Sequence, residues 1–295
     1  MQPAPIALFV YNRPEHTRKT LEALKANKHA SETELFVFSD GPKSETNRAA
    51  VAEVRRLLQT IEGFKAVHVT ERFENWGLAQ SIIAGVTELV NQFGRVIVLE
   101  DDLVTGPHFL DYMNDGLTTY ADDAIVASIH GYVYPIGTPL PETFFLRGAD
   151  CWGWATWKRA WDLFEPDGTK LLRQLEMQKL IRSFDFDDTD HFSDMLKRQI
   201  EGKNDSWAIR WNASAYLAGA LTLYPHASLV HNIGNDASGT HASRSNRFDS
   251  AVYTERVLVK RIPLAESSEA RGIFTVYFRS LRPSLLKRIW NKLCR

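Results

Sequence analysis

Three adjacent carboxylates, Glu100, Asp101 and Asp102, are the residues in this sequence best suited to chemistry. They come directly after the apolar run 96–99, which predicts a buried strand. Neighbouring carboxylates repel one another unless water or a cation neutralises them, and their oxygens suit hard ions such as Mg²⁺ and Mn²⁺. The triplet therefore predicts a divalent metal site at a strand end. The alternative is a solvated acidic loop that starts the next helix, where Asp102 would act as a cap.

Polar side chains also follow three other apolar runs, 6–10, 35–38 and 66–69, each of which predicts a strand. They are Tyr11, Asn12 and Arg13 after the first run, Asp40 and Gly41 after the second, and Arg72, Asn75 and Gly77 after the third. Ordinary turn and helix-cap chemistry explains any one of these clusters. Ligands of a parallel sheet bind beyond the carboxyl ends of its strands, so the clusters together favour a ligand-binding edge.

Segments with helical periodicity separate these runs, at 15–26, 44–60 and 78–93. Strands and helices that alternate with short connections imply right-handed crossovers and a mostly parallel, Rossmann-like α/β sheet flanked by helices. The first strand-to-helix turn, 11–14, has no G-x-G-x-x-G pattern, and no Walker G-x-x-x-x-G-K-[ST] pattern occurs in the chain. These absences argue against nicotinamide and P-loop chemistry.

The composition is that of a globular protein without a strong charge bias. Of its 295 residues, 35 are Lys or Arg and 36 are Asp or Glu, which argues against nucleic acid as a partner. The two cysteines, Cys151 and Cys294, exclude a disulfide framework and a cysteine-based zinc site and favour a reducing compartment. No apolar run approaches the ~20 residues of a transmembrane helix, and the N-terminus has no signal-peptide pattern. We therefore expect a cytoplasmic protein.

Tryptophan is concentrated in one segment of the second half, where four of the eight tryptophans lie within 152–161. Aromatic faces can stack on the apolar faces of sugar rings, and the indole N–H can bind a hydroxyl. Trp152 and Trp154 flank Gly153 in a predicted loop and are candidates for sugar contacts. The alternative is core or interface packing, which we favour for Trp157 and Trp161 because they lie on a predicted helix.

The acidic triplet also carries a family resemblance. The segment 99–102 resembles the D-x-D-type signature of GT-A glycosyltransferases, and its Glu-Asp-Asp form is similar to that of the N-acetylglucosaminyltransferase I family. The resemblance implies that Asp102 binds Mn²⁺ or Mg²⁺ and that Asp101 contacts the nucleoside of a nucleotide-sugar donor, with a UDP-sugar favoured.

Other parts of the first 120 residues agree with this resemblance. The segment 9–14 resembles the opening strand and nucleotide-base loop of such enzymes, and 39–41 resembles their second strand end. The segment 72–79 is similar to the N-x-G-x-A segment of family-two-like transferases. The resemblance thus implies donor contacts by Tyr11, Asn12, Arg13, Asp40, Arg72 and Asn75.

A catalytic base is implied by the segment 204–211, which is similar to the family's Asp-Asp-Trp-Met-Arg segment. Inverting transfer needs a carboxylate near the acceptor hydroxyl. Asp205 is the predicted base, because Asn204 stands where the family often has an acid, and Trp207 is a predicted sugar contact. The alternative role for Asp205 is an N-cap, since a helical pattern follows it.

The segment 223–241 resembles the part of the family that ends in a loop over the nucleotide diphosphate. The resemblance implies that Ser238 and Thr240 bind phosphate and that His231 or His241 completes the metal shell. A lone histidine is also compatible with a purely structural role.

Between Arg271 and Arg295 the chain has seven basic residues and no acidic one, with apolar residues at helical spacing. A basic amphipathic helix predicts contact with a membrane surface, hence peripheral association with the inner face of the membrane. The alternative is a helix packed on the protein's own core. We expect a donor half over 1–120, an acceptor-binding and catalytic half of the same domain over 121–265, and a basic tail over 266–295.

These features predict a metal-dependent, inverting hexosyl- or N-acetylhexosaminyltransferase that uses a nucleotide-sugar and a glycan or lipid-linked glycan acceptor. The expected setting, from family analogy, is synthesis of a bacterial surface polysaccharide such as O-antigen or capsule. One competitor is a sugar nucleotidyltransferase, which would need a glycine-rich phosphate loop after the first strand. The other is a non-catalytic glycan-binding module, which does not explain the acidic triplet.

Overall fold

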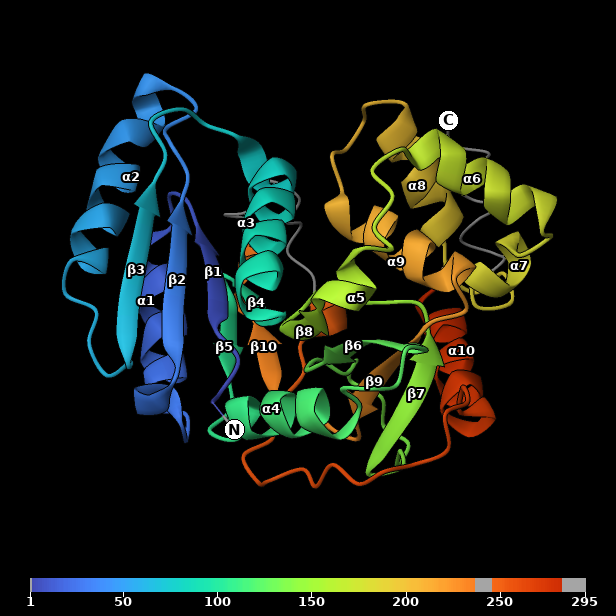
Figure 1. Ribbon diagram of the computed structural model, residues 1–295. Helices are drawn as coiled ribbons and strands as arrows, with labels where there is room; N and C mark the ends of the chain where they lie inside the picture. The colour runs from blue at the N-terminus through green and yellow to red at the C-terminus, as the bar shows by residue number, and fades with distance from the viewer. Residues whose placement is uncertain (1, 237–245, 283–295) are drawn as a thin grey trace.

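A computed structural model of the protein describes residues 2–236 and 246–282. Its centre is an eight-stranded sheet with the order β3-β2-β1-β4-β8-β6-β9-β7 (Figure 1). The strands are β1 (Ile6–Val10), β2 (Glu34–Ser39), β3 (Ala66–Glu71), β4 (Arg95–Glu100), β6 (Val126–His130), β7 (Thr143–Arg147), β8 (Trp154–Trp157) and β9 (Leu221–Pro225). The α/β class predicted from the sequence is confirmed.

The first four strands are parallel and alternate with three helices, as the sequence predicts. These helices are α1 (Pro14–Lys25), α2 (Glu45–Leu58) and α3 (Gly77–Phe93). Side chains of α1 and α2 share one core cluster with alternate residues of β1, such as Ile6 and Leu8. The intervening β1 residues, Ala7 and Phe9, face α3 in a second cluster. Burial on both faces explains why β1 is apolar throughout.

The sheet continues into the second half of the chain through antiparallel pairing of β4 with β8. Helix α4 (Phe109–Thr119) covers the same face as α1, and α5 (Lys158–Trp161) and α9 (Trp207–Leu217) cover the face of α3. Three further helices pack beside α9 as a separate group (Figure 1). They are α6 (Gly168–Met177), α7 (Ile181–Phe184) and α8 (Phe192–Ile200).

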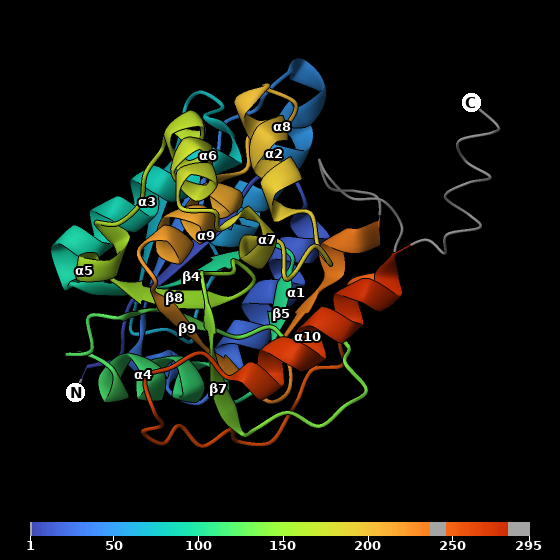
Figure 2. The same ribbon diagram turned by 90° about the vertical axis from the view of Figure 1, so that its right-hand side faces the viewer.

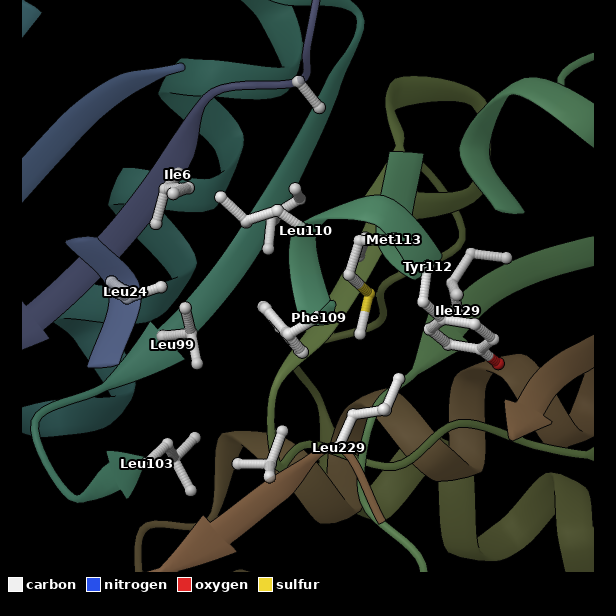
Figure 3. Close-up of a cluster of buried hydrophobic side chains, with 14 of the residues drawn as sticks. Ile6, Leu24, Leu99, Leu103, Phe109, Leu110, Tyr112, Met113, Ile129 and Leu229 are labelled. Atoms are coloured by element: carbon white, nitrogen blue, oxygen red, sulfur yellow. The ribbon is translucent and has the colours of Figure 1, made fainter. Parts of the chain in front are cut away.

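A second, two-stranded sheet fastens the chain just beyond the acidic triplet. It pairs β5 (Leu103–Thr105) with β10 (Val230–Asn232) in antiparallel register. Leu103 of β5 and Leu229, just before β10, lie in the same buried cluster as Leu99 and Phe109 (Figure 3). The end of β4 therefore rests on packed core rather than on a free loop. Short 3₁₀ turns lie at η1 (Ala30–Glu32), η2 (Ile233–Asp236) and η3 (Asn246–Phe248).

The C-terminal helix α10 (Ser268–Leu281) lies beside β7 (Figure 2). Ala270, Phe274 and Phe278 on its inner face are buried, whereas Val276 is exposed. For residues 268–281, the alternative prediction of a helix packed on the protein's own core is therefore confirmed. The stretch 283–295 lies outside the described residues. Among the residues that the structure describes, no helix is both long and apolar enough to cross a membrane.

Candidate active site

The polar ends of β2 and β3 meet at one edge of the sheet, as expected, and Asp40 is the centre of this contact. Its two carboxylate oxygens accept hydrogen bonds of 2.9 Å from the Asn75 side-chain amide, the Trp76 backbone N–H and the Gly77 backbone N–H. The last two N–H groups belong to the start of α3, where a negative charge is favourable. Asp40 thus ties the loop after β3 to the strand end of β2.

Gly41 allows these two loops to approach closely. A Cβ atom at this position would lie 2.5 Å from the Glu74 carbonyl carbon. Because that neighbour is backbone, it cannot rotate away as a flexible side chain would. Gly41 is therefore required for the close approach of the two loops, as well as for the turn that follows β2.

Arg72 is buried inside this edge, with its guanidinium 4.2 Å from the centre of the Trp76 ring. It also donates a hydrogen bond to the Ser81 hydroxyl on α3. Burial lowers the pKa of Arg72, and the nearby charge of Asp40 opposes that shift. The side chain braces the loop after β3, while its neighbour Phe73 is 95% exposed at the rim.

At the end of β4, Arg13 forms ion pairs with both Asp101 and Asp102 through the same guanidinium nitrogen. The Asp102 contact is 2.9 Å long. Asp101 is buried and also accepts a 3.4 Å hydrogen bond from the Tyr11 backbone N–H. The residues predicted after β1 and β4 are therefore in direct contact, and a cationic group lies between two carboxylates of the triplet.

Burial dominates the electrostatics of this acidic turn. It raises the pKa of Asp101 to about 6, against the lowering effect of Arg13. Burial, followed by the charges of Asp102 and Asp101, raises the pKa of Glu100 to about 8. Burial lowers the pKa of Arg13, but the charges and hydrogen bonds of Asp101 and Asp102 outweigh that effect and raise it. The turn therefore stabilises positive charge.

The donor atoms of this turn fit a hard divalent cation, since carboxylate oxygens are the ligands that Mg²⁺ and Mn²⁺ prefer. Within residues 2–236 and 246–282, no three His, Cys, Asp or Glu side chains are grouped closely enough to hold a metal ion alone. An ion bound by Asp102 would therefore take further ligands from water or from a substrate.

The segment after β10 covers the acidic turn. The Ile233 N–H donates a 2.9 Å hydrogen bond to the Asp102 carbonyl oxygen. A Cβ atom at Gly234 would overlap the Asp102 carboxylate, so glycine permits this approach. We call residues 230–236 the strap. His16 of α1 lies 3.2 Å from Asp236, which holds the far end of the strap near α1.

The four predicted strap and loop residues have different outcomes. His231 directs Nδ1 to the Ser250 carbonyl oxygen at 3.0 Å and belongs to no three-residue ligand group among the described side chains. The predicted phosphate and metal contacts Ser238, Thr240 and His241 lie outside the described residues.

Two of the predicted sugar-binding tryptophans belong to the core, which corrects the sequence interpretation. Trp154 lies on β8 rather than in a loop and is 0% exposed, and Trp207 of α9 is 2% exposed. Their rings are stacked, with 5.4 Å between the ring centres, and Trp161 and Trp211 pack against the Trp154 ring. Neither Trp154 nor Trp207 has a free face for a sugar. The core alternative holds for Trp161 as predicted, and Trp157 is also buried but on β8 rather than a helix.

Trp152 has a different environment. It is only partly buried and contacts the Tyr132 ring edge-to-face at 4.7 Å. It lines a cavity of about 1100 Å³ between the second half of the sheet, α8 and α10. Most of the other lining residues were not predicted as functional, because aromatic residues scattered along a sequence give no local signal. They include Tyr132, Tyr134, Asp150, Asp190, Tyr224 and Phe274.

Asp205 stands beside this cavity rather than in it. Its neighbours Asn204 and Ser206 line the cavity, whereas Asp205 lines a smaller hollow of about 420 Å³ against α3. The Asp205 side chain is 74% exposed and forms an ion pair of 3.1 Å with Arg210. Ser206 caps α9 by accepting a hydrogen bond from the Ile209 N–H, so the capping alternative for Asp205 is wrong.

Comparison with known proteins identifies the family to which the chain belongs. Residues 6–162, more than half of the chain, match the family model described as glycosyl transferase family 2. The chain therefore belongs to glycosyl transferase family 2, and the resemblance stated from its motifs is confirmed at the level of the family.

Two solved structures are similar to parts of the chain. The first, described as the crystal structure of S. aureus TarS, is 16% identical, with a TM-score of 0.31, 49% of this chain covered and 24% of that chain. The second, a putative nucleotide-diphospho-sugar transferase from Desulfovibrio desulfuricans G20, is 10% identical, with a TM-score of 0.37, 57% of this chain covered and 69% of that one. The chain thus spans about a quarter of the TarS length. No curated protein matches the sequence significantly.

Proposed function

We propose that this protein is a metal-dependent, inverting glycosyltransferase that transfers a hexosyl or N-acetylhexosaminyl group from a nucleotide-sugar, with a UDP-sugar favoured. The observation that carries the proposal is the acidic turn at the carboxyl end of β4. There Asp101 and Asp102 share the Arg13 cation at the ligand-binding edge of a family 2 fold.

The donor would bind along the edge formed by the ends of β1, β2 and β3. Tyr11 is braced there because its hydroxyl accepts a 2.9 Å hydrogen bond from the Lys43 N–H. Asp40 and Arg72 set the shape of the same edge through the start of α3. Asp102 would hold Mn²⁺ or Mg²⁺, which when bound supplies the positive charge that stabilises the leaving nucleotide diphosphate.

Asp205 would act as general base and accept the proton of the attacking acceptor hydroxyl. Its exposure leaves it free to meet a substrate, and Arg210 holds its side chain through the 3.1 Å ion pair. Its position at the start of α9, next to two residues that line the large cavity, supports this role. The assignment rests on the sequence resemblance together with this placement.

The acceptor would be a glycan or a lipid-linked glycan, in synthesis of a surface polysaccharide such as O-antigen or capsule. Such a role would place the protein in the cytoplasm, with contact to the inner face of the membrane through the basic residues beyond α10. The support for this part is the charge pattern of the sequence alone.

A thermal-shift titration of the full chain with UDP, GDP and CDP, with and without Mn²⁺, tests the donor site. A ligand that binds only the native state raises the melting temperature. We expect a Mn²⁺-dependent shift with one nucleotide, lost in Asp102→Ala and kept in Asp162→Ala, a control whose side chain is 58% exposed and paired with Lys158. Absence of a shift with every nucleotide would contradict the proposal and favour a non-catalytic glycan-binding module.

A further inference from the structure

The large cavity has a polar floor made of two carboxylates. One oxygen of Asp150 accepts a 2.8 Å hydrogen bond from the Cys151 N–H, and one oxygen of Asp190 accepts a 2.7 Å hydrogen bond from the His191 N–H. The other oxygen of Asp190 makes no hydrogen bond to a residue that the structure describes, and the other oxygen of Asp150 lies 3.6 Å from His130 Nε2. Burial raises the pKa of Asp190, which indicates that this carboxylate is poorly hydrated.

Within the described residues, no Lys or Arg side chain forms an ion pair with either carboxylate, and Arg198 and His191, which also line the cavity, are exposed. His130 lies 3.6 Å from Asp150, but it is fully buried, and burial lowers its pKa, so the ring is neutral near pH 7. Arg147 donates to the Tyr216 carbonyl oxygen and stacks on the Tyr216 ring. Lys197 belongs to the rim and pairs with Asp194. The floor therefore presents acceptor atoms with negative charge.

Two tyrosines place phenol groups beside these carboxylates. Tyr134 and Tyr224 both line the cavity, and within the described part of the chain neither hydroxyl has a hydrogen-bond partner. Burial and the charges of Asp150 and Asp190 raise the pKa of Tyr134, so that its hydroxyl stays protonated. The remaining wall is largely aromatic, with Trp152, Phe186 and Phe274 among its residues.

The segment between Asp150 and β8 packs against the strap over the acidic turn. The Gly131 N–H donates a 2.7 Å hydrogen bond to the Gly153 carbonyl, and a Cβ atom at Gly153 would lie 2.7 Å from the Val230 side chain at the start of the strap. Burial and the charges of Asp150, Glu100 and Asp102 raise the pKa of the Cys151 thiol. The floor and the acidic turn are thus within electrostatic reach of one another.

We propose that this cavity is the acceptor site and that it takes a sugar residue without acidic groups. The hydroxyl or amino groups of such a sugar would donate to Asp150 and Asp190, and its apolar face would lie on the aromatic wall. A uronic acid or a phosphorylated sugar would add a further negative charge beside two partly buried carboxylates that pair with no Lys or Arg side chain among the described residues, which is costly. The assignment of the cavity as the acceptor site rests on the proposed function, whereas its predicted selectivity for sugars does not.

Saturation-transfer NMR on the full chain can test this selectivity with three probes at equal concentration: methyl glucoside, methyl glucosaminide and methyl glucuronide. We expect the first two to receive saturation and the glucuronide to receive none. Asp150→Asn and Asp190→Asn should each weaken glucoside binding about tenfold and admit the glucuronide, because the loss of one charged hydrogen bond is accompanied by the loss of a repulsive charge. Asp162→Asn, outside the cavity, should leave both signals unchanged.

Tyr134→Phe provides a second variant that removes one hydroxyl and keeps the ring, in case an aspartate variant does not fold. It should weaken glucoside binding and leave the glucuronide excluded. Equal saturation of glucoside and glucuronide in the wild type would overturn the inference, as would absence of any sugar signal. If a nucleotide still raises the melting temperature in either of those cases, the proposed function stands. If sugars bind as expected but no nucleotide does, the proposed function fails and the cavity chemistry remains.

Discussion

The edge proposed to bind the donor and the cavity proposed to bind the acceptor are built in different ways. At the edge, polar side chains from successive strand ends bind one another directly, as Asp40 does with Asn75 and Arg13 with Asp102. The cavity is instead walled by aromatic residues from distant parts of the chain, from Tyr132 to Phe278. Hydrogen bonds and ion pairs hold the first region in place, and apolar packing holds the second.

The two regions also differ in how their carboxylates are compensated. The acidic turn contains a resident cation, because Arg13 pairs with both aspartates. Among the described residues, neither carboxylate of the cavity floor pairs with Lys or Arg, and the neutral ring of His130 lies near Asp150. A partly buried carboxylate without a paired cation favours a ligand that donates hydrogen bonds, whereas a paired cluster favours exchange of one cation for another.

The largest effect should come from Asp205, which lies beside the cavity without lining it. If Asp205 is the base, Asp205→Asn should lower kcat by about 10²–10⁴-fold, because the amide cannot accept the acceptor proton. Sugar binding in the cavity should be unchanged, since Asp205 does not line it. UDP release in the presence of the methyl glycoside that binds is the measurement. A kcat within a factor of about three of the wild type would assign the base to another carboxylate.

A smaller effect is expected where the strap covers the acidic turn. Gly234→Ala would force a Cβ atom into the Asp102 carboxylate and displace the strap or the side chain. We expect the affinity for Mn²⁺ in the presence of UDP to fall about tenfold, as for a residue that orients a metal ligand. Electron paramagnetic resonance of free Mn²⁺ measures it. Gly137→Ala is the matched control, because a Cβ there has no neighbour within 4 Å, and an equal loss in both variants would refute the steric explanation.

Arg13 offers a test of the resident cation. Since its guanidinium already pairs with both carboxylates, it should compete with a metal ion for them. Arg13→Gln should therefore bind Mn²⁺ without nucleotide several-fold more tightly than the wild type, while the melting temperature of the metal-free protein falls. Arg18→Gln removes an exposed arginine of α1, the helix that begins directly after Arg13, and should change neither quantity. Weaker Mn²⁺ binding by Arg13→Gln would show that Arg13 orients the ligands instead.

The smallest effect concerns stability at the cavity floor. Because the pKa of Asp190 is raised on folding, its ionisation disfavours the native state above the pKa of an unfolded carboxyl, about 3.9. Asp190→Asn should therefore raise the melting temperature by about 2 °C at pH 7, with a gain that shrinks as the pH falls towards about 4. Calorimetry at both pH values measures this change. A gain that is independent of pH would point to packing rather than charge.

The amino-acid sequence by itself determined the parallel first half of the sheet and the polar edge at its strand ends. An apolar run such as 6–10 and the periodicity of 78–93 are local patterns, so β1 and α3 lie where they were predicted. The side chains that follow the strands, Asp40 and Asp102 among them, were found because chain order alone sends parallel strand ends to one edge.

Only the tertiary structure decided the second half. Trp152 and Trp154 are two residues apart in the same motif, yet one lines a cavity and the other is 0% exposed in the core. Aromatic residues suit both environments, so neither composition nor spacing distinguishes them. The floor formed by Asp150 and Asp190 has no local signature at all, because it exists only where the segment before β8 meets the segment before α8. Contacts between residues far apart in the chain depend on packing, which a local pattern does not encode.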